Sequence, residues 1–155
     1  IPALAKLKDL DVETGFEKAF EIYNAVGVVT QHEGVAAKYA PELDMIIMPP
    51  EGLFNGPAEY HATRFHEIGH ATGHKSRLDR GLFGVGIEAY AEEELVAELF
   101  AAFACADVGI AKAGMTMNHA AYLKSWHRRL GEKPELFVDA VTSAWKALEW
   151  VRGQM

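Results

Sequence analysis

The segment ATRFHEIGHATGHKSRLDR, residues 62–80, decides how the chain is interpreted, because it carries three histidines at four-residue spacing. The three are His66, His70 and His74, and Glu67 directly follows the first of them. An α-helix has 3.6 residues per turn, so residues four apart lie above one another on one face. The spacing therefore predicts a helix on which two imidazoles can reach a single metal ion.

We expect this helix to begin at Asn55 or Gly56 and to end near Gly73. Asn and Gly are common N-cap residues, and Pro57 then stands in the first turn, where proline is favoured. Glu67 lies about 100° around the helix from the preceding histidine. It can therefore flank an ion without binding it and touch a water on that ion.

A catalytic zinc site needs a third protein ligand and an open position. His74 would align with His66 and His70 on a continuous helix, but Gly73 is expected to end that helix. Three histidines stacked on one straight face also cannot converge on a tetrahedral ion. The longer pattern HExxHxxGxxH is matched up to Gly73, but Ser76 stands where its last histidine should be. We therefore expect His74 to support another ligand, to face a substrate or to cap the helix, with ligation as the less favoured alternative.

The other candidate for the third ligand is the acidic segment YAEEELVAELFAAF, residues 90–103. Glu94 and Glu98 are four apart and share a helix face. We predict that Glu94 binds the ion and that Glu98 holds the distal nitrogen of His66 or His70. Glu93 is the alternative to Glu94. The simpler interpretation is a solvated acidic run in a first turn, which the helix dipole favours.

The rest of the chain predicts an α+β fold, in which a small N-terminal sheet and the histidine helix precede a helical C-terminal half. We expect one domain over residues 1–155. The predicted elements are helix 11–26, short strands within 28–40 and 43–48, helix 57–73, a glycine-rich loop at 81–87, and helices 88–110, 117–130 and 134–152.

Within helix 88–110 the apolar face and its alanines predict close contact with another helix. Leu95, Leu99 and Phe100 mark the face, and Ala97 is among the small residues that allow close approach. Cys105, on this alanine-rich helix, is expected to be buried as an apolar residue. Four arginines are expected to be solvated surface residues: Arg77, Arg80, Arg128 and Arg129.

Composition limits the classes of function. The formal net charge of −7 argues against nucleic-acid binding by this segment alone, because phosphate contacts need clustered Lys and Arg. The single cysteine excludes a disulfide framework and favours a reducing, cytoplasmic compartment. No apolar run approaches the roughly 18–20 residues of a membrane span. The chain starts with Ile1, so we expect a trimmed domain of a longer protein.

Four segments together resemble a known family. They are YAPELDMIIMPP (39–50), FHEIGHATGHKSRLDR (65–80), YAEEELVAELFAAF (90–103) and NHAAYLKSW (118–126). In this order and spacing they resemble the C-terminal zincin-like metallopeptidase domain of ArdC-type antirestriction proteins of conjugative plasmids and phages. The resemblance covers roughly residues 20–152.

The resemblance implies a zinc site formed by His66, His70 and a glutamate of EEELVAE, with Glu67 in the catalytic position. It also implies a missing N-terminal domain that binds single-stranded DNA. Restriction or host-defence proteins are further expected partners.

The leading hypothesis is a zinc peptidase of the gluzincin type. Zn²⁺ would be held by His66, His70 and Glu94, with water in the fourth position and Glu67 as the general base. A peptide or protein is then the substrate. The strand LDMIIMP, residues 43–49, is expected to form the upper edge of the cleft and to pair with an extended peptide.

Such a peptidase also needs a donor for the developing oxyanion. His119, Tyr122 and Trp126 share a face of the predicted helix 117–130. Tyr122 or His119 could supply the donor. The alternative interpretation places Tyr122 and Trp126 in the core.

Two rival hypotheses remain. The domain could bind zinc and cleave nothing, acting as an interaction module beside a DNA-binding domain that shields DNA from restriction enzymes. Alternatively the zinc is structural, which predicts a fourth protein ligand, with His74 as the candidate.

Overall fold

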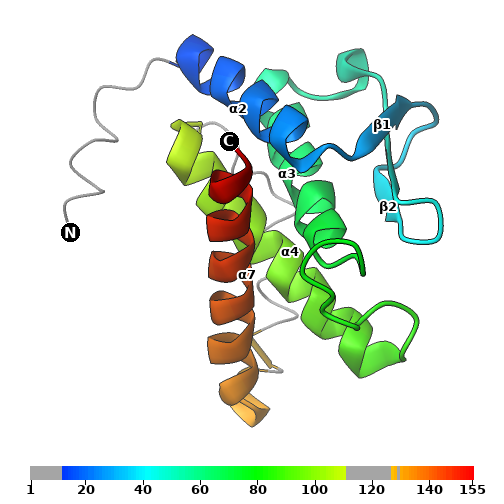
Figure 1. The fold of residues 1–155 in the computed structure, drawn as a ribbon, viewed down its shortest axis with the longest axis vertical. Helices are drawn as coiled ribbons and strands as arrows, with labels where there is room; N and C mark the ends of the chain where they lie inside the picture. Colours follow the sequence, from blue (N-terminus) through cyan, green and yellow to red (C-terminus); the bar gives the residue numbers. More distant parts are fainter. Residues whose placement is uncertain (1–11, 111–126, 129) are drawn as a thin grey trace.

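The computed structural model describes residues 12–110, 127–128 and 130–155, and it has the predicted α+β fold. Within that part of the chain, a three-stranded sheet is combined with the helices α2, α3, α4 and α7, and residues 127–128 and 130–132 are also helical (Figure 1). In chain order the elements are α2 (Val12–Val26), β1 (Val29–His32), β2 (Lys38–Ala40), β3 (Met45–Met48), the 3-10 helix η2 (Glu51–Leu53), α3 (Pro57–Thr72), α4 (Ile87–Val108) and α7 (Glu135–Gln154).

The sheet has the strand order β1–β3–β2, so β3 lies in the middle. β3 pairs in parallel with β1 and antiparallel with β2, with Ile46 opposite Thr30 on one side and Tyr39 on the other. The expectation that residues 43–49 form an edge open to a peptide is therefore wrong. Both hydrogen-bonding edges of β3 are already used, and β2 is the strand that lines the pocket beside the two histidines.

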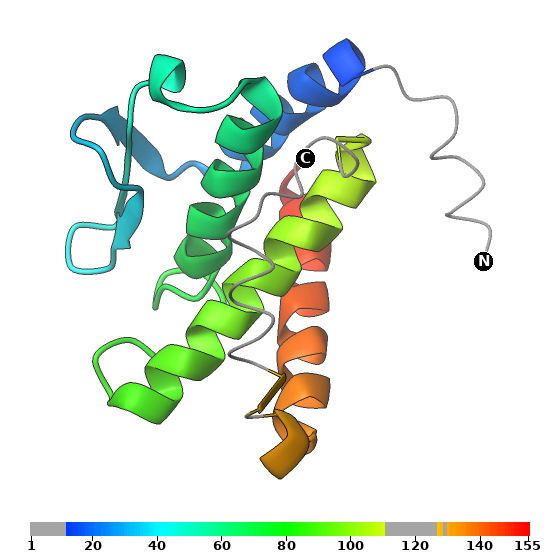
Figure 2. The same cartoon turned by 180° about the vertical axis from the view of Figure 1, so that it is seen from behind.

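The elements form successive layers. In both views α3 lies between the sheet on one side and the crossing pair α4 and α7 on the other (Figures 1 and 2). The core follows these contacts: Phe65 and Ile68 of α3, Val96 and Phe100 of α4, and Leu148 of α7 are almost fully buried. None of the helices in the described ranges is long and apolar enough to cross a membrane.

The contact between α3 and α4 is unusually close at Gly69, inside the HEIGH sequence. A Cβ atom at this position would lie 2.8 Å from the Cα and 3.0 Å from the carbonyl oxygen of Ala97. It would also lie 3.2 Å from Cδ1 of Phe100. The close approach predicted for Ala97 is thus confirmed, and it brings the glutamates of α4 to the histidines of α3.

The predicted helix ends agree with the structure to within about two residues. α3 begins at Pro57 after Gly56 and stops at Thr72, with Gly73 as its C-cap. α4 ends at Val108, before Gly109, whose φ of 85° is in the left-handed region that favours glycine. Cys105 is buried and free, as expected. The predicted helix 117–130 lies mostly outside the described residues.

Candidate metal centre

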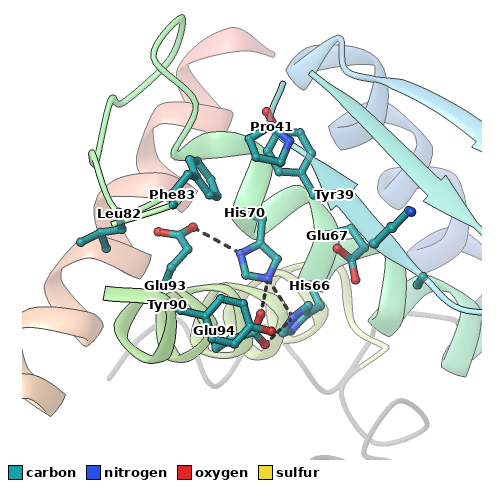
Figure 3. Close-up of a pocket in the computed structure, with 13 residues that line it drawn as sticks. Tyr39, Pro41, His66, Glu67, His70, Leu82, Phe83, Tyr90, Glu93 and Glu94 are labelled. Atoms are coloured by element: carbon teal, nitrogen blue, oxygen red, sulfur yellow. Dashed lines mark hydrogen bonds and ion pairs between the residues drawn. The ribbon is translucent and has the colours of Figure 1, made fainter. Parts of the chain in front are cut away.

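Three side chains from two helices converge on one point. His66 and His70 of α3 place their Nε2 atoms 3.1 Å apart. The Glu94 carboxylate of α4 lies 3.1 Å from Nε2 of His70 and 3.4 Å from Nε2 of His66 (Figure 3). In the described part of the chain this is the group of residues whose ligand atoms could hold one metal ion. Sequence spacing predicted the same three residues.

The other ring nitrogens of the two histidines each face a further carboxylate of α4. Nδ1 of His66 lies 2.9 Å from Oε2 of Glu98, the contact predicted for Glu98, and Nδ1 of His70 lies 3.4 Å from Oε1 of Glu93. An ionised carboxylate only accepts hydrogen bonds, so each Nδ1 carries the hydrogen and donates it. In a neutral imidazole the opposite nitrogen then presents a lone pair. Both Nε2 atoms therefore offer lone pairs to the same point.

This donor set fits a divalent cation such as Zn²⁺. Two imidazole lone pairs and a carboxylate would repel one another at these distances unless a proton or a metal ion lay among them. Zinc bonds of about 2.0–2.1 Å give a tetrahedron whose edges are about 3.3 Å long. The Nε2 atoms are 3.1 Å apart, and each lies 3.1 or 3.4 Å from a different oxygen of the Glu94 carboxylate, so the separations are of the size that such a site needs.

Glu67 lies in the same pocket but on the other side of the histidines from Glu94 (Figure 3). The residue is only 6% exposed. Burial raises the pKa of its carboxyl group above the usual value, although His66 and His70 act against this shift. A hydrogen bond from the backbone of Tyr39 in β2 also holds the carboxylate. Glu67 is thus a positioned carboxylate beside the cluster that could accept a proton.

The pocket around these residues has a volume of about 440 Å³. Beside the site residues it is lined by β2 and by the loop between α3 and α4. Lys38 and Tyr39 come from β2, Pro41 from the turn after it, and Leu82 and Phe83 from the loop. The rings of Tyr39 and Phe83 contact each other with a centroid distance of 5.7 Å. The wall opposite the ligands is therefore largely apolar, as is typical of ligand pockets.

Tyr90 also lines the pocket, one helical turn before Glu94 on α4. A hydrogen bond joins its hydroxyl group to the Glu94 carboxylate. The negative charge of Glu94, together with burial and this bond, raises the pKa of the phenol. The group therefore remains protonated near neutral pH and available as a donor. Tyr90 was not predicted from the sequence, although its spacing of four residues from Glu94 places the two side chains on the same helix face.

Arg80 is a buried member of the site's surroundings, so the expectation of a solvated surface residue is wrong. Its side chain is 8% exposed and forms two hydrogen bonds with Glu93. Glu93 is thereby accounted for as a partner of Arg80 and His70 rather than as a member of the ligand cluster.

Arg77 is likewise buried rather than solvated. Its guanidinium group donates to both carboxylate oxygens of Asp44, at 2.7 and 3.1 Å, and to the carbonyl oxygen of Ala71 at 3.1 Å. Asp44 belongs to the turn between β2 and β3, so this pair joins the loop after α3 to the sheet. Arg128, by contrast, is exposed as expected, and Arg129 lies outside the described residues.

His74 stands apart from the ligand cluster. It follows the end of α3, and its Nδ1 lies 2.7 Å from the hydroxyl group of Ser76 and 4.0 Å from Asp44. This placement favours a helix-end contact over ligation. The predicted oxyanion donors His119 and Tyr122, with Trp126, lie outside the described residues.

Comparisons with known proteins agree with this geometry. A protein family described as zincin-like metallopeptidase (MPTase-PolyVal) matches residues 17–143. The protein y4eC of Sinorhizobium fredii (strain NBRC 101917 / NGR234) is 35% identical over 139 residues, which are 89% of this chain and 45% of y4eC. Two proteins of Escherichia coli named DNA primase TraC are 39% and 40% identical over 137 residues, which are 87% of this chain but 9% and 13% of the primases.

Solved structures of the antirestriction protein ArdC from plasmid R388 are also similar. The Mn(II)-bound structure has a TM-score of 0.76 and 36% identity, covering 89% of this chain and 52% of ArdC. The metal-free structure has a TM-score of 0.74 and 36% identity, covering 88% and 50%. The chain thus spans about half the length of these relatives or less, and the expected resemblance to the ArdC domain is confirmed.

Proposed function

Because the chain belongs to the zincin-like metallopeptidase family, we propose that it is a zinc-dependent peptidase domain that hydrolyses peptide bonds. The proposed ligands are His66, His70 and Glu94, and the proposed general base is Glu67. One observation carries the proposal: a buried carboxylate outside the ligand set shares a pocket with three converging ligand groups. A structural zinc site would instead have a fourth protein ligand, and His74 lies outside the cluster.

The chemistry divides between the ion and the protein. When bound, Zn²⁺ supplies Lewis acidity, which lowers the pKa of a water and polarises a carbonyl group. Glu67 accepts a proton from the attacking water, whose oxygen bonds to the carbonyl carbon. The same carboxyl group then gives that proton to the amine as the carbon–nitrogen bond breaks. Burial suits Glu67 to this exchange, because it raises the pKa of the carboxyl group toward neutral pH.

Negative charge develops on the carbonyl oxygen during this attack and needs a donor. Tyr39 and Tyr90 both line the described pocket, but the Tyr39 hydroxyl group donates to Asp44, whereas the Tyr90 hydroxyl group lies beside Glu94. We assign it as the donor for the oxyanion. His119 and Tyr122 stay predictions for the same role.

The substrate is a peptide or protein segment in extended conformation. β2 rather than β3 is the strand for it, because β2 lines the pocket and its outer side is unpaired among the described strands. An extended peptide can add to such an edge through backbone hydrogen bonds. Tyr39, Pro41 and Phe83 then offer apolar surface to its side chains.

In the longer protein, this domain would work beside a part that binds single-stranded DNA. The match to ArdC and TraC covers only part of each relative, and the net charge of −7 leaves DNA binding to another segment. We place the whole of residues 1–155 in one peptidase domain. Its targets would be restriction or host-defence proteins in the cytoplasm.

The test compares the wild-type chain with Glu67→Gln, both loaded with one equivalent of Zn²⁺. A fluorescently labelled unfolded protein such as casein is the substrate. The proposal predicts cleavage by the wild type, and equal zinc content but at least ~100-fold slower cleavage in the variant. Equal cleavage by both proteins would remove Glu67 from the mechanism.

A second candidate function is supported by the relatives, which include an antirestriction protein and a DNA primase. On this reading the domain binds metal without catalysis and supports DNA binding and protection from restriction. Glu67→Gln in the full-length protein discriminates the two. Antirestriction activity in cells is retained if the domain is an interaction module and lost if cleavage is required.

A further inference from the structure

We infer that Arg80 is a positioning residue for the metal centre, which acts by fixing Glu93 against the His70 imidazole. The inference rests on the proposed metal site. Arg80 does not line the pocket, and it is not among the three residues whose ligand atoms converge.

Arg80 and Glu93 form a buried ion pair with two hydrogen bonds. Nε of Arg80 donates to Oε2 of Glu93 at 2.9 Å, and Nη2 donates to Oε1 at 2.5 Å. The two side chains are 8% and 3% exposed. A two-pronged contact of this kind fixes the plane of the carboxylate as well as its position. Glu93 therefore has one orientation in the fold.

Arg80 is itself anchored to α3 by two hydrogen bonds. Nη2 also donates to the carbonyl oxygen of Gly69 at 2.7 Å, and Nη1 donates to the hydroxyl group of Thr72 at 2.8 Å. Carbonyl groups in the last turn of a helix lack helical partners, and a positive charge is favoured there. Arg80 thus joins the end of the histidine helix to the carboxylate on α4.

Gly73 provides the space for this side chain. A Cβ atom at Gly73 would lie 2.5 Å from Nη2 and 2.7 Å from Cζ of Arg80. The C-cap glycine therefore does more than end α3, since it leaves room for the guanidinium group against the helix end.

Glu93 in turn contacts the imidazole of His70. Oε1 of Glu93, which accepts from Arg80, also lies 3.4 Å from Nδ1 of His70. The corresponding contact of His66 with Glu98 is shorter, at 2.9 Å. Glu93 lies closer to Arg80, at 2.5 and 2.9 Å, than to His70, so Arg80 is its main partner. Through Glu93, Arg80 sets the ring orientation that points Nε2 at the ion.

The experiment measures Zn²⁺ affinity by competition with a chromophoric chelator, on the complete 155-residue chain. Loss of a partner that orients a metal ligand typically weakens binding about 10–100-fold. We expect Arg80→Gln to raise the Kd for Zn²⁺ by a factor in that range. The absorption spectrum of the Co²⁺-loaded variant should also change, because it reports the geometry of the ligands.

A double-mutant cycle tests whether Arg80 acts through Glu93. If it does, Arg80→Gln should have little further effect in a Glu93→Gln background, because the two effects are not independent. If the loss of Zn²⁺ affinity in the double variant equals the product of the losses in the two single variants, Arg80 affects the site by another route. That result would overturn the inference.

Arg77→Gln is the matched control. Arg77 lies in the same loop, has the same 8% side-chain exposure and also pairs with a carboxylate, but that carboxylate is Asp44. This variant should lose stability and keep the wild-type Kd for Zn²⁺. An equal loss of affinity in Arg77→Gln would show a general effect of the loop and overturn the inference.

Folding is checked by circular dichroism and thermal unfolding of the metal-free proteins. If Arg80→Gln does not fold, Arg80→Lys takes its place, because it keeps the charge and loses the two-pronged contact. We expect weaker Zn²⁺ binding by this variant too, and wild-type affinity would overturn the inference. Failure of the wild type itself to bind Zn²⁺ would instead overturn the proposed metal site, and the role of Arg80 with it.

Discussion

Gly69 and Ala97 are in contact through their backbones, with no room for a side chain on Gly69. Gly69 lies one residue before His70, and Ala97 lies between Glu94 and Glu98. α3 and α4 therefore approach each other closely beside the metal centre. The distance between ligands on the two helices depends on this crossing.

Gly69→Ala should damage both the fold and the site. The added Cβ would lie 2.8 and 3.0 Å from backbone atoms of Ala97, so the helices must move apart. Overpacking of this kind typically costs about 1–3 kcal/mol. We expect a lower free energy of unfolding in urea and weaker Zn²⁺ binding in the same variant.

Gly153→Ala is the control for that change. Gly153 also lies in a helix, α7, but a Cβ there would meet no atom within 4 Å. Alanine favours helix by up to about 1 kcal/mol over glycine, so stability should be unchanged or slightly higher. Equal behaviour of the two variants would contradict the steric explanation.

The ligand assignment predicts different metal contents for four variants. His66→Ala, His70→Ala and Glu94→Ala should each lose most of their bound Zn²⁺, since each removes one of three converging groups. His74→Ala should keep about one Zn²⁺ per chain. Mass spectrometry of the purified proteins measures this directly, and zinc loss confined to His74→Ala would contradict the assignment.

Tyr90→Phe should separate catalysis from metal binding. The phenol interacts with Glu94 in the free site and is proposed to turn its single O–H to the oxyanion, whereas it is not one of the ligands. Loss of one such donor typically lowers kcat by about 100–1,000-fold. We expect that fall, with a nearly unchanged KM, in the variant saturated with Zn²⁺, and unchanged kcat would exclude the role.

His61, which lies outside the metal centre, should make the stability of the fold depend on pH. Burial, and then the positive charge of Arg64, lowers the pKa of His61 to about 4. Its Nδ1 lies 2.6 Å from the hydroxyl group of Tyr23. The unfolded chain therefore binds a proton between about pH 6.5 and 4 that the folded chain does not. Stability should fall as the pH is lowered through this window.

The comparison of wild type with His61→Gln isolates this effect. Urea unfolding of both metal-free proteins is measured between about pH 7 and pH 4. The free energy of unfolding of the wild type should fall more steeply than that of the variant. Parallel pH profiles, or an NMR titration of His61 near pH 6.5, would contradict the prediction.

Local sequence features predicted the histidine helix and its ends. Pro57 and Gly73 act on their own neighbourhood, and the spacing of His66, His70 and Glu67 follows from helix geometry alone. Glu94 and Glu98 could be predicted for the same reason, because a spacing of four places them on one helix face. Such features do not require knowledge of the tertiary fold.

Other features depended on contacts between distant segments. Arg80 resembles an exposed loop arginine in the sequence, and its burial depends on Glu93 and on the space above Gly73. The central place of β3 could not be derived locally either, since an apolar strand of four residues suits an edge or a centre equally well.

The length of β2 has a consequence for target choice under the proposed function. A strand of three residues can align only a few backbone groups of a bound peptide, and the apolar wall beside it discriminates weakly between similar side chains. Such a cleft would accept many sequences at low affinity. Selectivity would then arise from tethering, because a DNA-bound neighbour in the same polypeptide raises the effective concentration of proteins assembled on that DNA.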